Sequence, residues 1–245
     1  MSTFYFGGKW SDELDLIITR PMVRPTWAPE TEFTPIIGRP RKNPYTKTYY
    51  ENARMIIRAV MADASQEKVR DIYNTLRGYG HLVISTSPYE FMNAYCKLPV
   101  PEAQALLMAE LPIEFECEPF AYKTIPRHYS ITDATSYEEA TNLGTVFVDP
   151  TILFRPSKAT TVFDVNGKTF TVSTPQEIIT ASYAETYSIT INCDDELVYF
   201  TRPNGDNVGC TELTTGSFPR LGVGMNYIKH DGVRDAHIDY SERFY

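Results

Sequence analysis

Hydrophobic and acidic residues alternate strictly over residues 113–118, near the middle of the chain. Because successive side chains of a strand point to opposite faces, this period of two predicts a half-buried strand with carboxylates on its outer face. A proline cannot donate to a sheet ladder, so we expect Pro119 to end the strand. The apolar positions are Ile113, Phe115 and Cys117, and the acidic ones are Glu114, Glu116 and Glu118.

Strand patterns of this kind fill most of the first half of the chain, and one helix pattern interrupts them. Asp63 and Gln66 fit a capping box at the start of the helix, and Gly78 and Gly80 fit its end. Positions 69, 72, 73 and 76 form its apolar stripe. A sheet with one packed helix is an α+β domain, which we place at residues 1–124. The strand patterns cover residues 3–6, 14–18, 54–62, 81–85, 91–98 and 106–118.

Residues 20–48 contain six prolines, too many for central strands of a sheet. Within this segment, residues 38–47 are basic and rich in turn-forming residues. This composition favours a protruding loop or hairpin arm near residues 34–48. A solvated loop is the alternative to a partner-binding arm, since charge runs usually face water. The basic side chains of the arm are Arg39, Arg41, Lys42 and Lys47.

The second half shows short strand patterns, separated by turn signals and without a helix pattern, which predicts a β-sandwich over residues 125–245. Asn166-Gly167 is the strongest hairpin signal, because both central residues of a type I′ turn need positive φ. We expect further hairpins across residues 194–196 and 230–232, and a turn at Asn204-Gly205. The strand patterns cover residues 129–135, 146–154, 161–165, 168–172, 188–193, 197–201, 226–229 and 236–240.

Length and charge restrict the function classes. A chain of 245 residues predicts one or two domains. The net charge of −8 makes nucleic-acid binding through phosphate contacts a poor hypothesis. No apolar run approaches 18 residues and no signal peptide is apparent, so we expect a protein made in the cytoplasm without a membrane span.

The residue types that carry catalysis or metal binding show no productive spacing. The four cysteines lack a C-x-x-C pair, the four histidines are scattered, and no nucleophile elbow exists. Asp194, Asp195 and Glu196 are consecutive and fit a solvated turn better than a metal site. Gly222-Val223-Gly224 lacks the third glycine of a nucleotide loop. We therefore expect no metal, no cofactor, no catalytic residues and no enzyme.

Tyrosine is unusually frequent, with 17 copies. Its large apolar ring and polar tip suit wet protein–protein or carbohydrate surfaces, although tyrosine is also simply a good strand residue. A carbohydrate-binding module that attaches to a cell-surface saccharide is therefore the competing hypothesis. The location of both tryptophans in the first half weakens it. Its candidate stacking residues are Tyr183, Tyr187, Tyr199 and Tyr227.

Several short motifs occur in an informative order. The first half contains Phe6-Gly7-Gly8, Pro35-Ile36-Ile37-Gly38-Arg39, Tyr49-Tyr50-Glu51-Asn52, Leu76-Arg77-Gly78-Tyr79-Gly80 and Phe115-Glu116-Cys117-Glu118-Pro119-Phe120. The second half contains Asn142-Leu143-Gly144-Thr145, Pro150-Thr151-Ile152, Ile191-Asn192-Cys193-Asp194, Gly216-Ser217-Phe218-Pro219 and Leu221-Gly222-Val223-Gly224-Met225-Asn226. Over nearly the whole chain, this order and spacing resemble siphophage distal tail proteins.

The resemblance implies a structural protein of a long-tailed phage virion. The N-terminal domains of that family close a six-membered ring at the distal end of the tail tube, and the C-terminal domain is a galectin-like or carbohydrate-module-like sandwich. The implied partners are further copies of the chain, the tail tube protein, a tail-tip lysin or fibre and receptor-binding proteins. It also places subunit interfaces in the N-terminal domain, where the basic arm is our hypothesis for a contact.

Overall fold

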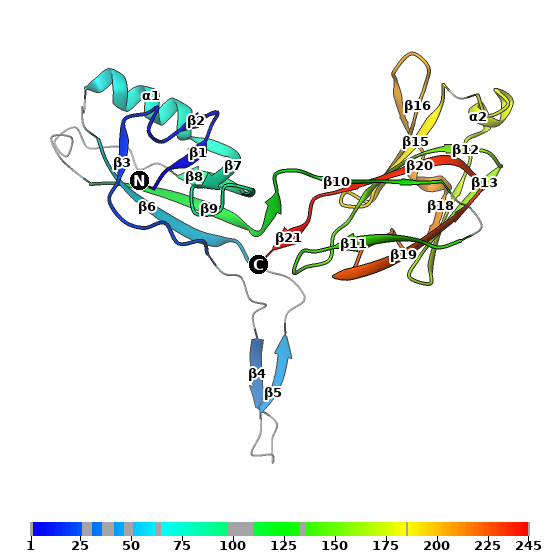
Figure 1. Ribbon diagram of the computed structural model, residues 1–245, viewed down its shortest axis with the longest axis horizontal. Helices are drawn as coiled ribbons and strands as arrows, with labels where there is room; N and C mark the ends of the chain where they lie inside the picture. The colour runs from blue at the N-terminus through cyan, green and yellow to red at the C-terminus, as the bar shows by residue number, and fades with distance from the viewer. Residues whose placement is uncertain are drawn as a thin grey trace. The chain divides into compact units, whose positions relative to one another are not determined.

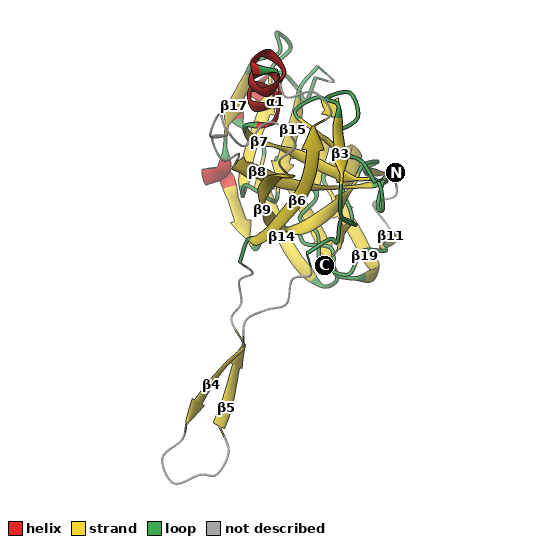
Figure 2. Ribbon diagram, turned by 90° about the vertical axis from the view of Figure 1, so that its left-hand side faces the viewer, coloured by secondary structure: helices red, strands yellow, loops and turns green. Residues whose placement is uncertain are grey.

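The computed structural model describes residues 2–25, 31–35, 42–46, 51–61, 65–97, 110–132, 136–184 and 186–244. The fold is mainly β, as predicted (Figure 1, Figure 2). The chain divides into two compact units, one within Met1–Thr124 and the other within Ile125–Phe244.

The described residues of the first unit form an antiparallel sheet with the strand order β2-β1-β7-β8-β9-β6-β3 and one helix, α1 (Gln66–Leu76). A separate two-stranded sheet is formed by β4 (Thr31–Pro35) and β5 (Lys42–Thr46). The strands of the larger sheet are β1 (Phe4–Phe6), β2 (Lys9–Trp10), β3 (Leu16–Ile18), β6 (Ala53–Met61), β7 (Gly78–Ile84), β8 (Glu90–Lys97) and β9 (Glu110–Lys123).

One face of this sheet forms the core of the first unit. Ile72 and Leu76 of α1 are buried in the same apolar cluster as the inner side chains of the sheet. Phe115 of β9 lies at its centre, where the rings of Phe4 and Phe6 approach it edge-on at 5.8 and 5.1 Å. The alternation of residues 113–118 therefore has the predicted effect, since its apolar side is fully buried.

The predicted start of the helix is wrong. The N-cap is Ser65, whose side chain accepts a hydrogen bond from the Lys68 amide at 3.5 Å. Gln66 is thus the first helical residue and cannot close a capping box from the third position. Asp63 lies outside the described residues. At the other end, Gly78 has a φ of +100° and opens β7, so the helix ends before the glycines.

Pro119 does not end β9, which continues to Lys123. The register with β8 explains why the proline is tolerated. Met92 of β8 pairs with Ala121 of β9, and Ala94 of β8 pairs with Cys117 of β9. One residue therefore lies between the two paired positions on β8, whereas three residues, 118–120, lie between them on β9. Pro119 is the middle one of these three. Such a bulge interrupts the ladder, which removes the need for a backbone donor there.

The second unit contains a six-stranded sheet with the order β10-β20-β12-β15-β16-β17 and a five-stranded sheet with the order β11-β19-β13-β14-β18. Their inner faces share one apolar core, in which Phe154 and Phe163 from opposite sheets meet edge-on at 5.1 Å. The unit is therefore the predicted β-sandwich. Its strands are β10 (Arg127–Ile131), β11 (Glu138–Asn142), β12 (Thr151–Pro156), β13 (Thr160–Val165), β14 (Lys168–Ser173), β15 (Ser188–Asn192), β16 (Leu197–Thr201), β17 (Asn207–Gly209), β18 (Thr214–Gly216), β19 (Gly224–Asp231) and β20 (Val233–Tyr240). A further short strand, β21 (Arg243–Phe244), belongs to neither of these two sheets.

The predicted turns of the sandwich are largely confirmed. Asn166 and Gly167 both have positive φ, 53° and 80°, and join β13 to β14. The strands β15 and β16 pair across residues 193–196, and β16 pairs with β17 across the turn at Gly205.

The hairpin predicted across residues 230–232 is wrong, because β19 and β20 belong to different sheets. Gly232, with a φ of +80°, turns the chain from one layer of the sandwich to the other. The sequence pattern also missed a short helix, α2 (Gln176–Thr180), which contains only one buried residue and so shows no apolar stripe. Predicted strand 146–154 begins later, since Val148 makes only an isolated bridge to Leu221.

Gly232 offers a test of this corner. A methyl group at Gly232 would overlap the carbonyl oxygen of Thr160 as well as face an unfavourable positive φ. We expect Gly232→Ala to lower the free energy of unfolding of the sandwich by roughly 2–4 kcal/mol. Gly205→Ala is the matched control: its φ is +90° but open space surrounds it, so about 1 kcal/mol is expected.

Urea unfolding followed by far-ultraviolet circular dichroism measures the difference. Both tryptophans precede residue 125, so their fluorescence reports on the first unit alone and should be unchanged in either variant. Equal losses in the two variants would contradict the close approach to Thr160.

Candidate functional site

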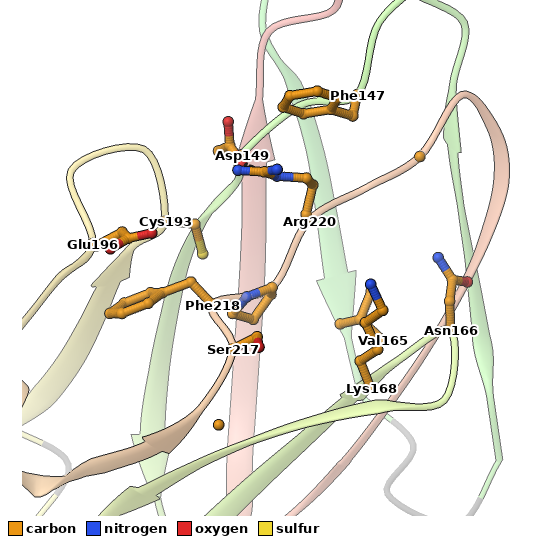
Figure 3. A pocket seen from close by; sticks show the side chains of 13 residues that line it. Phe147, Asp149, Val165, Asn166, Lys168, Cys193, Glu196, Ser217, Phe218 and Arg220 are labelled. Carbon is orange, nitrogen blue, oxygen red and sulfur yellow. Dashed lines mark hydrogen bonds and ion pairs between the residues drawn. The ribbon is translucent and has the colours of Figure 1, made fainter. Parts of the chain in front are cut away.

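A cavity of about 710 Å³ opens on the second unit (Figure 3). Its walls come from the segment before β12, the turn between β13 and β14, the turn between β15 and β16, and the segment after β18. Aromatic, amide, hydroxyl and charged groups all line it. Among them are Phe147, Asp149, Asn166, Lys168, Cys193, Glu196, Ser217, Phe218 and Arg220.

Asp149 organises one wall of this cavity. Its carboxylate is 8% exposed and accepts hydrogen bonds from Arg220 Nε at 2.7 Å and Arg243 Nη1 at 2.8 Å. Arg243, itself buried, also donates to Asp194 at 2.7 Å. The Arg220 guanidinium lies 4.2 Å from the centroid of the Phe147 ring, a cation–π contact. Two arginines thus neutralise the buried carboxylate and hold the wall in one geometry.

Cys193 also lines the cavity, but burial raises the pKa of its thiol well above the usual range. The other three cysteines are buried too, and burial raises the pKa to about 12 for Cys96 and Cys117 and to about 11 for Cys210. All four thiols therefore stay protonated at neutral pH.

The acidic run at residues 194–196 forms a hydrogen-bonded turn. The side-chain oxygen of Asn192 accepts from the amides of Asp194 and Asp195, each at 3.2 Å. Glu196 adopts a φ of +53° and reaches the rim of the cavity. Within the described ranges, no three His, Cys, Asp or Glu side chains are grouped to hold a metal ion. No described helix has the length and apolar character to cross a membrane.

The four candidate stacking tyrosines lie at separate places. Tyr183 and Tyr187 are half-buried against the core of the sandwich, and the Tyr187 hydroxyl donates to Glu177 at 3.4 Å. Tyr199 lies on the outer face of the six-stranded sheet, whereas Tyr227 lies on the outer face of the five-stranded sheet. These outer faces point in opposite directions, so the set does not form one site.

Tyr137 is a further exposed tyrosine, which the sequence pattern did not single out. It precedes β11 and shares a shallow hollow with Tyr227. Its hydroxyl donates to Asp164 at 3.0 Å, and this hydrogen bond raises the pKa of the Tyr137 phenol.

The first unit presents a second kind of surface, the outer face of its sheet. Register places Tyr79, Tyr95, Glu116 and Arg54 in one row across β7, β8, β9 and β6. Tyr79 is 62% exposed, Tyr95 is 48% exposed, and Ile56 is exposed nearby. A face that mixes large aromatic side chains with charges is typical of protein–protein interfaces.

Ion pairs and hydrogen bonds fix the carboxylates of this face. Arg54 Nη2 lies 2.5 Å from Glu114 Oε2, and Lys97 pairs with Glu116. The Lys97 hydrogen bond lowers the pKa of Glu116. The Tyr79 hydroxyl donates to Glu118 at 2.8 Å. Partial desolvation of this hydroxyl, followed by the effect of the Glu118 carboxylate, raises the pKa of Tyr79 to about 12, although much of the ring stays exposed.

Most of the predicted basic arm lies outside the described residues, including Arg39, Arg41 and Lys47. Lys42 is the first residue of β5, and its backbone pairs with Pro35 of β4. The contact assigned to these four residues stays a prediction.

No protein-family model and no curated protein matches the sequence. The structure, in contrast, is similar to a solved one, the crystal structure of the Dit protein of phage SPP1, which is described as a paradigm of the hub adsorption apparatus in phages that infect Gram-positive bacteria. It matches over 100% of both chains with a TM-score of 0.76 and 14% sequence identity. This chain has the fold of SPP1 Dit.

Two structures of the phage P2 baseplate in its activated conformation show the same fold at lower similarity. The one with Ca matches over 99% of this chain and 98% of that chain, with a TM-score of 0.55 and 7% identity. The one with Sr matches over 98% of both chains, with a TM-score of 0.53 and 8% identity. The resemblance to phage tail-tip hub proteins, predicted from the order of motifs, is confirmed at the level of the fold.

The wall around Asp149 generates a stability test. Asp149→Asn removes the carboxylate charge that lies between Arg220 and the buried Arg243. We expect the free energy of unfolding of the sandwich to fall by roughly 3 kcal/mol. Asp194→Asn, at a carboxylate that is 62% exposed, should cost at most about 1 kcal/mol.

Thermal unfolding of both variants, followed by circular dichroism, distinguishes the two costs. A smaller loss for Asp149→Asn than for Asp194→Asn would contradict the central position assigned to Asp149.

Proposed function

We propose that this chain is a structural component of a long-tailed phage virion. Six copies form a ring at the distal end of the tail tube, and the ring joins the tube to the tail-tip adsorption apparatus. The observation that carries this proposal is the likeness to SPP1 Dit over the full length of both chains. A match of that extent includes both units, which a shared sandwich alone would not explain.

In this role the first unit makes the contacts between subunits. The exposed row of Tyr79, Tyr95, Glu116 and Arg54 supports the proposal, because a sheet with one buried face leaves its other face available to neighbours. The partners in the virion are the tube protein, a tail-tip lysin or fibre and a receptor-binding protein. The chain acts as a scaffold and not as an enzyme.

The mass in solution tests the ring directly. Light scattering behind a sizing column should give about six times the 27.9 kDa of one chain, or twice that value if two rings associate. Negative-stain images of the same peak should show closed rings. A chain that remains a monomer at every concentration, also in the presence of tail tube protein, would contradict the proposal.

The basic arm is the more specific hypothesis. Replacing Arg39, Arg41, Lys42 and Lys47 together by serine removes four positive charges from one stretch. We expect the concentration for half-assembly to rise at least about tenfold, equivalent to ~1.4 kcal/mol, with unfolding of the monomer unchanged.

The matched control keeps the charge at all four positions: Arg39→Lys, Arg41→Lys, Lys42→Arg and Lys47→Arg. Sedimentation velocity over a concentration series measures assembly of both variants. Normal assembly of the serine variant would rule out the arm contact but would not contradict the proposed ring.

A further inference from the structure

A shallow hollow of about 380 Å³ lies on the outer face of the five-stranded sheet. Four residues line it: Tyr137, Asn166, Gly167 and Tyr227. The volume lies within the range of small-molecule sites, about 300–1,000 Å³. Gly167 contributes open space, because no atom lies within 4 Å of where its side chain would begin.

The two tyrosines are neighbours by register. Glu138 pairs with Ile228, so Tyr137, one residue earlier, lies beside Lys229, and Lys229 Nζ is 5.8 Å from the centroid of the Tyr137 ring. Tyr227 is two residues before Lys229 and therefore projects from the same face of β19. Tyr137 is 50% exposed and Tyr227 is 46% exposed, so both offer ring surface to a ligand.

The floor of the hollow is held rigidly by Asn166. The backbone of Asn166 donates to the Tyr227 carbonyl at 2.9 Å, and its side-chain oxygen accepts from the Tyr227 amide at 2.8 Å. Its side-chain nitrogen donates to Asn226 at 2.8 Å. These hydrogen bonds order the lining groups before a ligand binds. Binding therefore costs the protein less conformational entropy than it would on a mobile loop.

Charged groups flank the aromatic pair. Asp164 accepts from the Tyr137 hydroxyl at 3.0 Å and from the Gly167 amide at 2.8 Å. Lys229 is the cross-strand partner of Asp164. The hollow thus presents two aromatic rings and an amide, and a carboxylate and an ammonium group lie beside it.

We propose that this hollow, which we call the tyrosine shelf, binds a pyranose unit of an oligosaccharide. A pyranose presents C–H groups on its faces and hydroxyl groups around its edge. The faces pack on exposed aromatic rings, and the hydroxyl groups exchange hydrogen bonds with carboxylate, ammonium and amide groups. The tyrosine shelf supplies both kinds of partner.

The neighbouring cavity of Figure 3 extends this site. Asn166 lines the tyrosine shelf and the larger cavity alike, and Lys168 lies on the cavity side of the same turn. Lys168 is exposed and lines that cavity. A chain of sugar units on the shelf would therefore continue toward further polar groups, which favours an oligosaccharide over a single sugar.

Saturation-transfer NMR on the full-length chain tests the proposal with maltohexaose, cellohexaose and chitohexaose, three pyranose oligomers that differ in linkage and substituents. At least one should receive saturation from the protein. We expect Tyr137→Ala and Tyr227→Ala each to weaken its binding at least tenfold, whereas Tyr227→Phe, which keeps the ring, should retain it within about threefold.

Tyr199→Ala is the matched control, since Tyr199 occupies the outer face of the other sheet. Unchanged thermal unfolding checks that each variant is folded. The proposal would be overturned if none of the three saccharides received saturation from the unaltered chain. It would also be overturned if Tyr199→Ala weakened binding as much as Tyr137→Ala and Tyr227→Ala do. Neither result depends on ring formation, so this inference can fail while the proposed scaffold role stands.

Discussion

The buried side-chain amide of Asn226 fixes the region of the sandwich on which both hollows depend. Its oxygen accepts from the Gly222 amide and from Asn166 Nδ2, both at 2.8 Å, and its nitrogen donates to the carbonyls of Gly222 and Gly224 at 2.9 and 3.0 Å. The side chain is almost fully removed from water, and these hydrogen bonds offset the cost of its desolvation. One polar residue thereby ties the segment that enters β19 to the turn between β13 and β14.

Much of the fold follows from periodicity wherever one face of a strand is buried and apolar. β9 is the clearest case, because its inner residues form the core and its outer residues pair with charges on β6 and β8. Periodicity does not predict the structure where the pairing of strands decides the conformation of a residue. Pro119 is accommodated by a bulge, and Gly232 turns between layers; both depend on which strand lies opposite, and local sequence does not contain that information.

The candidate site was predictable only in part, for a related reason. Tyr227 could be found from composition and strand pattern, but its partner Tyr137 could not. The strand that positions Tyr137 is β11, and the residues on its inner side include Glu138 and the fully buried Asn142. Asn142 is satisfied there by the Val146 carbonyl and the Gly144 amide. Polar residues at inward positions conceal the alternation that identifies a strand.

Under the proposed role, the four buried cysteines have a further consequence, because a virion protein leaves the cell in which it is made. Exchange between thiols and disulfides requires a thiolate, and buried, protonated thiols supply almost none. A chain of this kind can pass from the reducing cytoplasm to oxidising surroundings without gaining or losing a covalent cross-link. In an assembled tail, the four cysteines would therefore stay free thiols from folding until adsorption, whatever the redox state of the surrounding medium.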